Sequence, residues 1–184
     1  MEFGLWNAWW FFLYYWLPMP LLRTFRPANL DSMSGGEFTP SEARQRVILY
    51  VIFFAALAYS LFVPFRLGTL WFSIGLPVAL LGAVFYGFAV RELMREELDK
   101  APLRHGAYRF SRHPLYVAEF VMFVGVAVAC SSLWILLFAL ITFAFHAAHA
   151  AEEERDCLAR YGEPYAAYLS RTPRWLGITS RKSD

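Results

Sequence analysis

The sequence predicts an all-α, polytopic membrane protein with five transmembrane helices, the last two of which form a C-terminal hairpin, followed by an amphipathic cytoplasmic tail helix. The first observation behind this prediction is composition. Of the 184 residues, 58% are hydrophobic and 19% are aromatic, more than a water-soluble domain of this size can bury. The second observation is a set of long segments without Asp, Glu, Lys or Arg, and the third is how Lys and Arg are distributed between these segments.

The first charge-free segment covers residues 3–22. A hydrocarbon core about 30 Å thick is crossed by roughly 20 apolar residues rising 1.5 Å each, so one segment of this length makes one span. The segment is preceded by Glu2 instead of cations and lacks a small-residue cleavage site, which argues against a signal peptide. Its many Trp and Tyr residues are typical of a membrane interface. We therefore expect a mature helix that is tilted or lies partly in the interface.

The second and third helices are predicted over the charge-free residues 47–65 and 67–90. Before them, residues 27–40 are rich in turn-forming residues and are predicted to be a cytoplasmic connector. This connector ends in Thr-Pro-Ser-Glu, residues 39–42, a sequence typical of a helix start.

The fourth charge-free segment, residues 120–151, is too long for one span. Pro114 suits the first turn of a helix, where its missing N–H costs nothing, so the helical region is expected to begin there. A break at residues 130–132, Cys-Ser-Ser, divides residues 114–151 into two helices joined by a tight turn. These helices bring the predicted number of spans to five.

Beyond Gly162 and Pro164, a short helix is predicted whose apolar side carries three tyrosines and a leucine. We expect this tail helix to lie in the interface and to cover the site between the two hairpin ends. The apolar residues in question are Tyr161, Tyr165, Tyr168 and Leu169.

The distribution of positive charge supports the five-span topology and orients it. Cytoplasmic loops retain Lys and Arg, and of the 17 such residues only Arg66 falls on the side opposite to the rest. This places the N-terminus outside and the C-terminus in the cytoplasm, as expected for a multi-pass protein of a bacterial inner membrane. The remaining cations lie in the first loop (Arg23, Arg26, Arg44, Arg46), the third loop (Arg91, Arg95, Lys100, Arg104, Arg109, Arg112) and the tail (Arg155, Arg160, Arg171, Arg174, Arg181, Lys182).

Three regions follow from this layout: N-terminal helices with their connector over residues 1–99, a region bearing the polar motifs over residues 100–176, and a flexible tail over residues 177–184. Cys130 and Cys157 fall on opposite sides of the bilayer, so no disulfide between them is expected. A net charge of +2 is too small to indicate a nucleic-acid partner.

Polar residues enter the membrane at two places, and the first is the start of the fourth helix. His113, Tyr116 and Glu119 follow one another at three-residue intervals, which places them along one helix face that descends from the cytoplasmic surface. An ionisable group inside hydrocarbon is costly and often functional, so Glu119 is a candidate site residue. The alternative is that Arg112, His113 and Tyr116 anchor the interface while Glu119 is neutralised in helix packing.

The second place is the end of the fifth helix, where His146, His149 and Glu153 share one face. The cluster Glu152, Glu153 and Glu154 could be a solvated surface patch. Three carboxylates near a helix C-terminus nevertheless oppose the helix dipole. We therefore expect compensation by cations of the third loop or by a ligand.

Two interpretations of these residues remain open at this point. His113, His146 and His149 could together bind haem or a metal ion, since imidazoles at one depth on neighbouring helices can form such a site. No second carboxylate-histidine repeat supports a two-metal centre, and we expect no metal. The other possibility is a noncatalytic membrane scaffold.

The two polar places together resemble a known family. The segments GAYRFSRHPLY at 106–116, the acidic pair near 153, YG at 161–162, PYAAY at 164–168 and TPRW at 172–175 occur in this order with the family's spacing. They resemble the isoprenylcysteine carboxyl methyltransferase and phospholipid methyltransferase group of integral membrane enzymes. The resemblance covers residues 100–175, whereas the first hundred residues resemble the family only as hydrophobic helices.

The resemblance implies an S-adenosylmethionine-dependent methyltransferase, similar to isoprenylcysteine carboxyl O-methyltransferases, with the cofactor bound at the cytoplasmic ends of the last two helices. Glu153 matches the family's cofactor-binding glutamate. The other cofactor-binding positions that the resemblance implies, joined by Arg112 from its chemistry as a carboxylate partner, are Lys100, Ala101, Pro102, Leu103, Tyr108, Arg112, His113, Pro114, Leu115 and Tyr116.

One position departs from the family pattern. Members that methylate a prenylcysteine carboxylate have an arginine one turn before the glutamate, where this chain has His149. An imidazole with a reference pKa of about 6.5 holds a carboxylate less well than a guanidinium. The acceptor could therefore be a prenylated thiol or carboxylate, a phospholipid amine or a small lipophilic thiol.

The catalytic candidates are Glu153, His149 and Glu119, and the substrate-binding candidates are His146 and His149. Methyl transfer is an in-line displacement that depends mainly on alignment and on exclusion of water. A general base helps only if the acceptor arrives protonated, and His149 and Glu119 both remain open for that role. A water-soluble donor would enter from the cytoplasm and meet a lipophilic acceptor from the bilayer at the interface.

Overall fold

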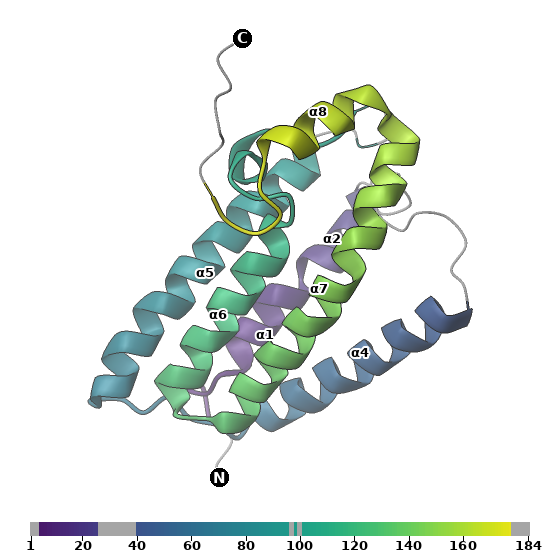
Figure 1. Cartoon of the computed structure of the whole chain (residues 1–184). Coiled ribbons are helices and arrows are strands. Elements are labelled where there is room, and N and C mark those ends of the chain that lie inside the picture. The colour runs from purple at the N-terminus through teal and green to yellow at the C-terminus, as the bar shows by residue number, and fades with distance from the viewer. Residues whose placement is uncertain (1–3, 26–39, 96–97, 99–100, 178–184) are drawn as a thin grey trace.

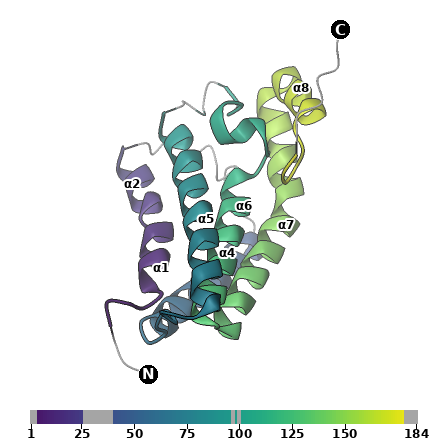
Figure 2. The same cartoon turned by 90° about the vertical axis from the view of Figure 1, so that its left-hand side faces the viewer.

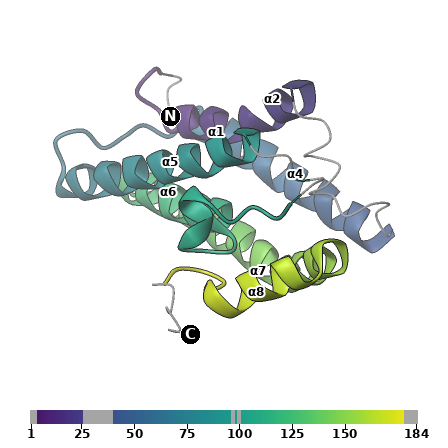
Figure 3. The same cartoon turned by 90° about the horizontal axis from the view of Figure 1, so that it is seen from above.

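The computed structural model describes residues 4–25, 40–95, 98 and 101–177, and within these ranges every regular element is helical. Three long helices, α5 (Leu70–Arg95), α6 (Pro114–Cys130) and α7 (Leu133–Tyr161), run alongside one another as the centre of the bundle (Figures 1 and 2). α4 (Pro40–Ser60) crosses them at an angle, as the view from above shows (Figure 3). The predicted all-α class is confirmed.

Three of the described helices are long and apolar enough to cross a membrane: α5, α7 and the part of α4 from Ala43 to Ser60. α6 is apolar but shorter, with 17 residues. Large apolar side chains such as Leu81, Val84 and Leu140 are exposed on the outside of the bundle, where lipid would cover them. The chain is therefore an integral membrane protein, while the span number of five stays a prediction.

The N-terminal segment differs from the single helix predicted over residues 3–22. It forms two helices of eight residues, α1 (Trp9–Trp16) and α2 (Pro18–Phe25), which meet at Leu17. Pro18 has no N–H with which to continue the hydrogen-bond ladder, so the helix breaks there. Ahead of α1, the backbone N–H of Ala8 donates to Val63 O at 3.0 Å and ties this segment to the loop after α4.

The other predicted helices are present, but some of their ends differ: α4 ends at Ser60 instead of residue 65, α5 extends to Arg95, and α7 extends to Tyr161. α4 begins at Pro40, inside the predicted start, and α6 begins at Pro114. The hairpin turn lies at Ser131 and Ser132, where Ser131 adopts a left-handed conformation with φ of 51° and the Ser132 hydroxyl accepts a hydrogen bond from the Ile135 N–H. The connector at residues 27–39 and the tail at 178–184 lie outside the described residues.

α5 and α6 pack closely because small residues face each other. A Cβ added to Gly82 would lie 2.4 Å from Met122 N, and one added to Gly125 would lie 2.2 Å from Ala79 N. Only glycine allows these backbones to approach so far, an arrangement common between membrane helices. The close contact holds α6, which carries the predicted polar motif, against the rigid centre of the bundle.

The aromatic core lies on the other side of α6, where Phe12 of α1 meets Phe123 of α6 and Phe138 of α7. At one end of the bundle, α8 (Glu163–Arg171) turns across the ends of the long helices, next to the short 3-10 helix η1 (Gly106–Arg109) (Figure 1). The predicted tail helix is thus confirmed. The bundle serves to bring η1, the start of α6, the end of α7 and α8 to one place.

Candidate active site

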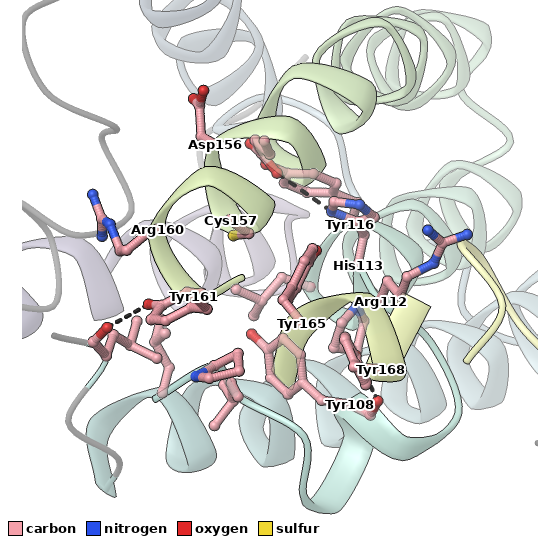
Figure 4. Close-up of a pocket in the computed structure, with 17 residues that line it drawn as sticks. Tyr108, Arg112, His113, Tyr116, Asp156, Cys157, Arg160, Tyr161, Tyr165 and Tyr168 are labelled. Carbon is pink, nitrogen blue, oxygen red and sulfur yellow. Dashed lines mark hydrogen bonds and ion pairs between the residues drawn. The ribbon is translucent and has the colours of Figure 1, made fainter. Parts of the chain in front are cut away.

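A cavity lies at this end of the bundle, between η1, α6, α7 and α8 (Figure 4). The cavity has a volume of about 160 Å³ and is open to solvent on one side. Most of the predicted cofactor-binding residues line it. They are Pro102, Leu103, Tyr108, Arg112, His113, Pro114, Leu115, Tyr116 and Glu153.

Glu153 is held in the cavity wall by two side chains of the α6 start. His113 Nδ1 lies 3.3 Å from Glu153 Oε2, and the Tyr116 hydroxyl donates a hydrogen bond to Glu153 Oε1. His113 is the residue before Pro114, the first residue of α6, and its N–H donates to the Ser111 hydroxyl at 3.1 Å. The local turn therefore fixes the direction in which the imidazole leaves the backbone.

Glu154 is buried and makes a separate cluster with two arginines. Arg174 donates to it twice, from Nε at 3.0 Å and from Nη2 at 2.7 Å, while Arg112 Nη1 lies 3.0 Å away. These hydrogen bonds raise the pKa of Arg174, so it stays charged. α7 continues to Tyr161, so the expected position of the three glutamates near its C-terminus is wrong. The expected compensation by a third-loop cation is nevertheless found for Arg112. The contribution of Arg174 from the tail was not predicted.

His113 connects the two carboxylates, because its Nε2 lies 3.2 Å from Glu154 Oε1 while its Nδ1 faces Glu153. The ring is 8% exposed. A buried imidazole between two carboxylates has little freedom to turn, so this residue is well positioned for a fixed role in the cavity wall.

Tyrosines from α8 form the opposite wall. The Tyr168 hydroxyl donates to Tyr108 O at 2.7 Å, and Tyr161 at the end of α7 donates to Leu98 O. Burial raises the pKa values of the Tyr165 and Tyr168 phenols, which therefore remain neutral donors. The prediction that the tail helix covers the site is confirmed for Tyr165 and Tyr168, which line the cavity. Tyr161 also lines the cavity, but it is the last residue of α7, so its predicted place on the tail helix is wrong.

Five residues that line the cavity were not predicted from the sequence. Asp156, Cys157 and Arg160 follow Glu153 by three, four and seven positions, so they continue its helix face toward the cavity mouth. That spacing could have identified them. Leu93 and Leu98 come from the end of α5 and the segment after it, and no motif marks them in the sequence.

Glu119 and His146 form a second layer, deeper in the bundle than the cavity wall. Glu119 is 3% exposed, and its Oε2 lies 2.9 Å from His146 Nε2. The His146 ring lies parallel to the Tyr116 ring, with 4.0 Å between the ring centres and 7° between the planes. The structure thus brings these two predicted residues together, next to the cavity wall.

His149 takes a different position from the one its predicted role suggests. Its Nδ1 donates to Phe145 O at 2.8 Å, one turn back on the same helix, and the residue does not line the cavity. Ala101 does not line it either. Lys100 lies outside the described residues.

The three histidines do not converge on a shared point. Among the described residues, no group of three or more His, Cys, Asp or Glu side chains is arranged to hold a metal ion. His113 is bound by Glu153 and Glu154, and His146 is bound by Glu119. A haem or metal site built on His113, His146 and His149 finds no support in this arrangement.

Comparisons with known proteins bear on the same part of the chain. The family model described as "Phospholipid methyltransferase" matches residues 63–163, which contain α5, η1, α6 and α7. Methanethiol S-methyltransferase from Crocosphaera subtropica (strain ATCC 51142 / BH68) is 31% identical over 101 residues, which covers 52% of this chain and 39% of that relative. The chain therefore spans well under half the length of that relative.

Proposed function

Because the chain belongs to the phospholipid methyltransferase family, we propose that it transfers a methyl group from S-adenosylmethionine to a lipophilic acceptor at the cytoplasmic surface of the membrane. The observation that carries the proposal is the cavity at the end of α6 and α7, in which Glu153 is held by His113 and Tyr116. Residues 100–176 would form the methyltransferase region.

The chemistry of the cavity fits this donor. S-adenosylmethionine supplies a methyl group on a positively charged sulfur and also carries a carboxylate and an adenine ring. Glu153 and the face of Tyr116 suit a positive charge, and the neutral phenols of Tyr108, Tyr165 and Tyr168 suit an aromatic ring. Apolar and aromatic side chains make up much of the lining, so a donor that fills the cavity would displace water and strengthen each of these interactions.

The donor's carboxylate needs a cation or backbone donors. Arg112 is bound to Glu154, and Arg160, whose side chain is labelled in Figure 4, also lines the cavity and lies over the Tyr161 ring. The backbone at Ala101, Pro102 and Leu103 adjoins the same wall, as Pro102 and Leu103 line the cavity. We assign the donor's carboxylate to these groups, with Arg112 as a second cation. The assignment of Lys100 to donor binding, which the resemblance implies, stays a proposal.

The acceptor would arrive through the bilayer. An isoprenylcysteine carboxylate, a phospholipid or a lipophilic thiol would each bring an apolar body that lies among the lipid-facing helices. The methanethiol methyltransferase relative supports including thiols in this set. We further propose that the cavity faces the cytoplasm, with the N-terminus outside, in a bacterial inner membrane.

Donor binding tests the proposal directly. The purified protein in detergent is titrated with S-adenosylmethionine by calorimetry, alongside Glu153→Ala and, as a matched control, Glu152→Ala, whose carboxylate is exposed. A hydrogen bond to a charged group contributes roughly 1.5–3 kcal/mol, so Glu153→Ala should weaken binding about 10- to 100-fold. The control should bind like the unaltered protein.

The binding result separates the enzyme from a noncatalytic scaffold. A protein that fails to bind the donor at millimolar concentration is not this enzyme. Equal affinities of Glu153→Ala and the unaltered protein would show that the donor site lies elsewhere. Incubation with methyl-labelled donor and total lipid extract then identifies the species that becomes labelled.

A further inference from the structure

Glu119 and His146 are two ionisable side chains at membrane depth that donor binding does not use. Glu119 Oε2 lies 2.9 Å from His146 Nε2, and the phenol of Tyr15 from α1 lies beside the same carboxylate. Burying these polar groups away from water costs free energy that an apolar contact between α6 and α7 would not cost. Two ionisable groups held at this depth therefore indicate a further role.

The contact between the two residues decides which nitrogen of His146 is free. A carboxylate can only accept, so Nε2 carries the hydrogen and the neutral ring has its lone pair on Nδ1. Within the described part of the chain, no hydrogen bond to Nδ1 is formed. The side chain of His146 is 18% exposed, whereas Glu119 behind it is 3% exposed.

This geometry is that of a general base supported by a carboxylate. The carboxylate fixes the tautomer and the direction of the ring, and it stabilises the imidazolium that forms when Nδ1 takes a proton. The ring also lies against Tyr116, whose hydroxyl is bound to Glu153 in the cavity wall. A proton acceptor therefore stands one ring away from the donor cavity, on the side of the membrane core.

The charges nearby indicate what kind of acceptor this base serves. Residues 120–151 contain no charged side chain, and the two nearest arginines of the site, Arg112 and Arg174, are bound to Glu154. An acceptor carboxylate would find the Glu119 carboxylate instead of a cation, and it would need no base because it is already ionised at neutral pH. The site suits an acceptor that arrives with a proton to lose.

The pKa values of the two kinds of acceptor favour a thiol over an amine. The reference pKa values are about 6.5 for histidine, 8.5 for a thiol and 10.4 for an alkylammonium group. Whatever the basicity of His146, a thiol therefore gives up its proton about two pKa units more readily than an alkylammonium group. At neutral pH the deprotonated, reactive fraction of a thiol is about a hundred times that of an amine.

We propose that His146, positioned by Glu119, is the general base for a lipophilic thiol acceptor; this inference rests on the function proposed above. His146 Nδ1 takes the S–H proton, and the sulfur lone pair forms a bond to the methyl carbon of the bound donor. The bond between that carbon and the donor sulfur breaks, and its electron pair stays on the donor sulfur, which becomes a neutral thioether. The proton remains on His146 and is then released to water.

Three acceptors that have similar alkyl chains but different reactive groups test the class of acceptor. The purified full chain in detergent is incubated with methyl-labelled S-adenosylmethionine and octanethiol, octylamine or octanoate at pH 7. Octanethiol should be methylated at least ten times faster than the other two. Faster methylation of octanoate or octylamine would overturn the proposal.

Two variants test the base, with His105→Gln as a matched control because the His105 side chain is exposed and does not line the cavity. His146→Gln should lower thiol turnover at pH 7 by about 100-fold or more, and Glu119→Gln by less. The dissociation constant for the donor should change less than about threefold in both, which also shows that they fold. His105→Gln should behave like the unaltered protein.

The pH profile distinguishes a base from a merely structural residue. Glu119, Tyr116 and Glu153 face His146 from α6 and α7, and Tyr15 of α1 and Tyr86 of α5 adjoin Glu119. In the unaltered protein these groups stay in place, and kcat/KM for octanethiol should level off once His146 is neutral. In His146→Gln, activity should rise toward pH 9 as the thiol ionises by itself.

The outcomes are separable from those of the donor test. If the donor binds and octanethiol is methylated equally by His146→Gln and the unaltered protein, the base assignment is wrong and the enzyme assignment stands. If the unaltered protein does not bind the donor, both fall.

Discussion

Replacement of Glu154 by glutamine removes one negative charge from the centre of the cytoplasmic cluster while keeping the size of the side chain. Glu154 accepts hydrogen bonds from Arg174, in the segment after α8, and from His113, at the α6 N-terminus. It also forms an ion pair with Arg112, in the segment before α6. The substitution therefore loosens three segments from α7 at once.

The size of the effect follows from how far each partner is exposed. Breaking a fully buried ion pair costs about 3–5 kcal/mol. Here the side chains of Glu154, Arg112 and Arg174 are 9%, 16% and 38% exposed, so water solvates part of the released charge. We expect a loss of about 2–3 kcal/mol, which for a chain of this length lowers Tm by roughly 4–12 °C.

Thermal unfolding of the purified protein in detergent, followed by intrinsic tryptophan fluorescence, measures this shift. Arg174→Ala removes only the more exposed partner and should lower Tm by less than Glu154→Gln. Glu152→Gln, which removes an exposed carboxylate two residues before Glu154, should leave Tm unchanged. Equal Tm values for Glu154→Gln and Glu152→Gln would refute the reasoning.

Two further predictions concern the helix contact and the cavity roof. Gly82→Val places a Cβ 2.4 Å from Met122 N and should destabilise the protein by about 1–3 kcal/mol or more, seen as a lower Tm, whereas Leu81→Val on the exposed side of the same helix should not. Tyr168→Phe removes a hydrogen bond to the η1 backbone, worth about 1 kcal/mol, and should weaken calorimetric donor binding about fivefold. Tyr59→Phe, at the hairpin end of the bundle, should leave donor binding unchanged.

Helix boundaries were predictable where the local sequence decides them. Pro114 starts α6 and the Ser131–Ser132 turn ends it, because both effects act on the backbone of the residues themselves. Pro18 carried the same kind of signal, yet the length of the apolar segment suggested one unbroken helix. The break in the structure shows that the missing N–H outweighs apolar continuity at that position.

Contacts between helices were predictable only in part. Spacing placed His113, Tyr116 and Glu119 on one face of α6, and that face is the one the structure turns toward α7. The rotation of α7 about its axis decides which of His146 and His149 meets Glu119, and packing across the whole bundle sets that rotation. The pairing with His146 could not be obtained from one helix alone. Arg174, twenty residues beyond Glu154, depends in addition on the path of α8.

The rotation of α7 also explains why three consecutive glutamates differ in environment. Successive residues of an α-helix point about 100° apart. Glu152 is exposed, Glu153 lies in the cavity wall, and Glu154 is buried under Arg112 and Arg174. Because His113 reaches Glu153 with Nδ1 and Glu154 with Nε2, the donor site and the structural cluster share one imidazole. Its replacement would therefore lower stability and donor affinity together, whereas Glu153→Ala and Arg174→Ala separate the two effects.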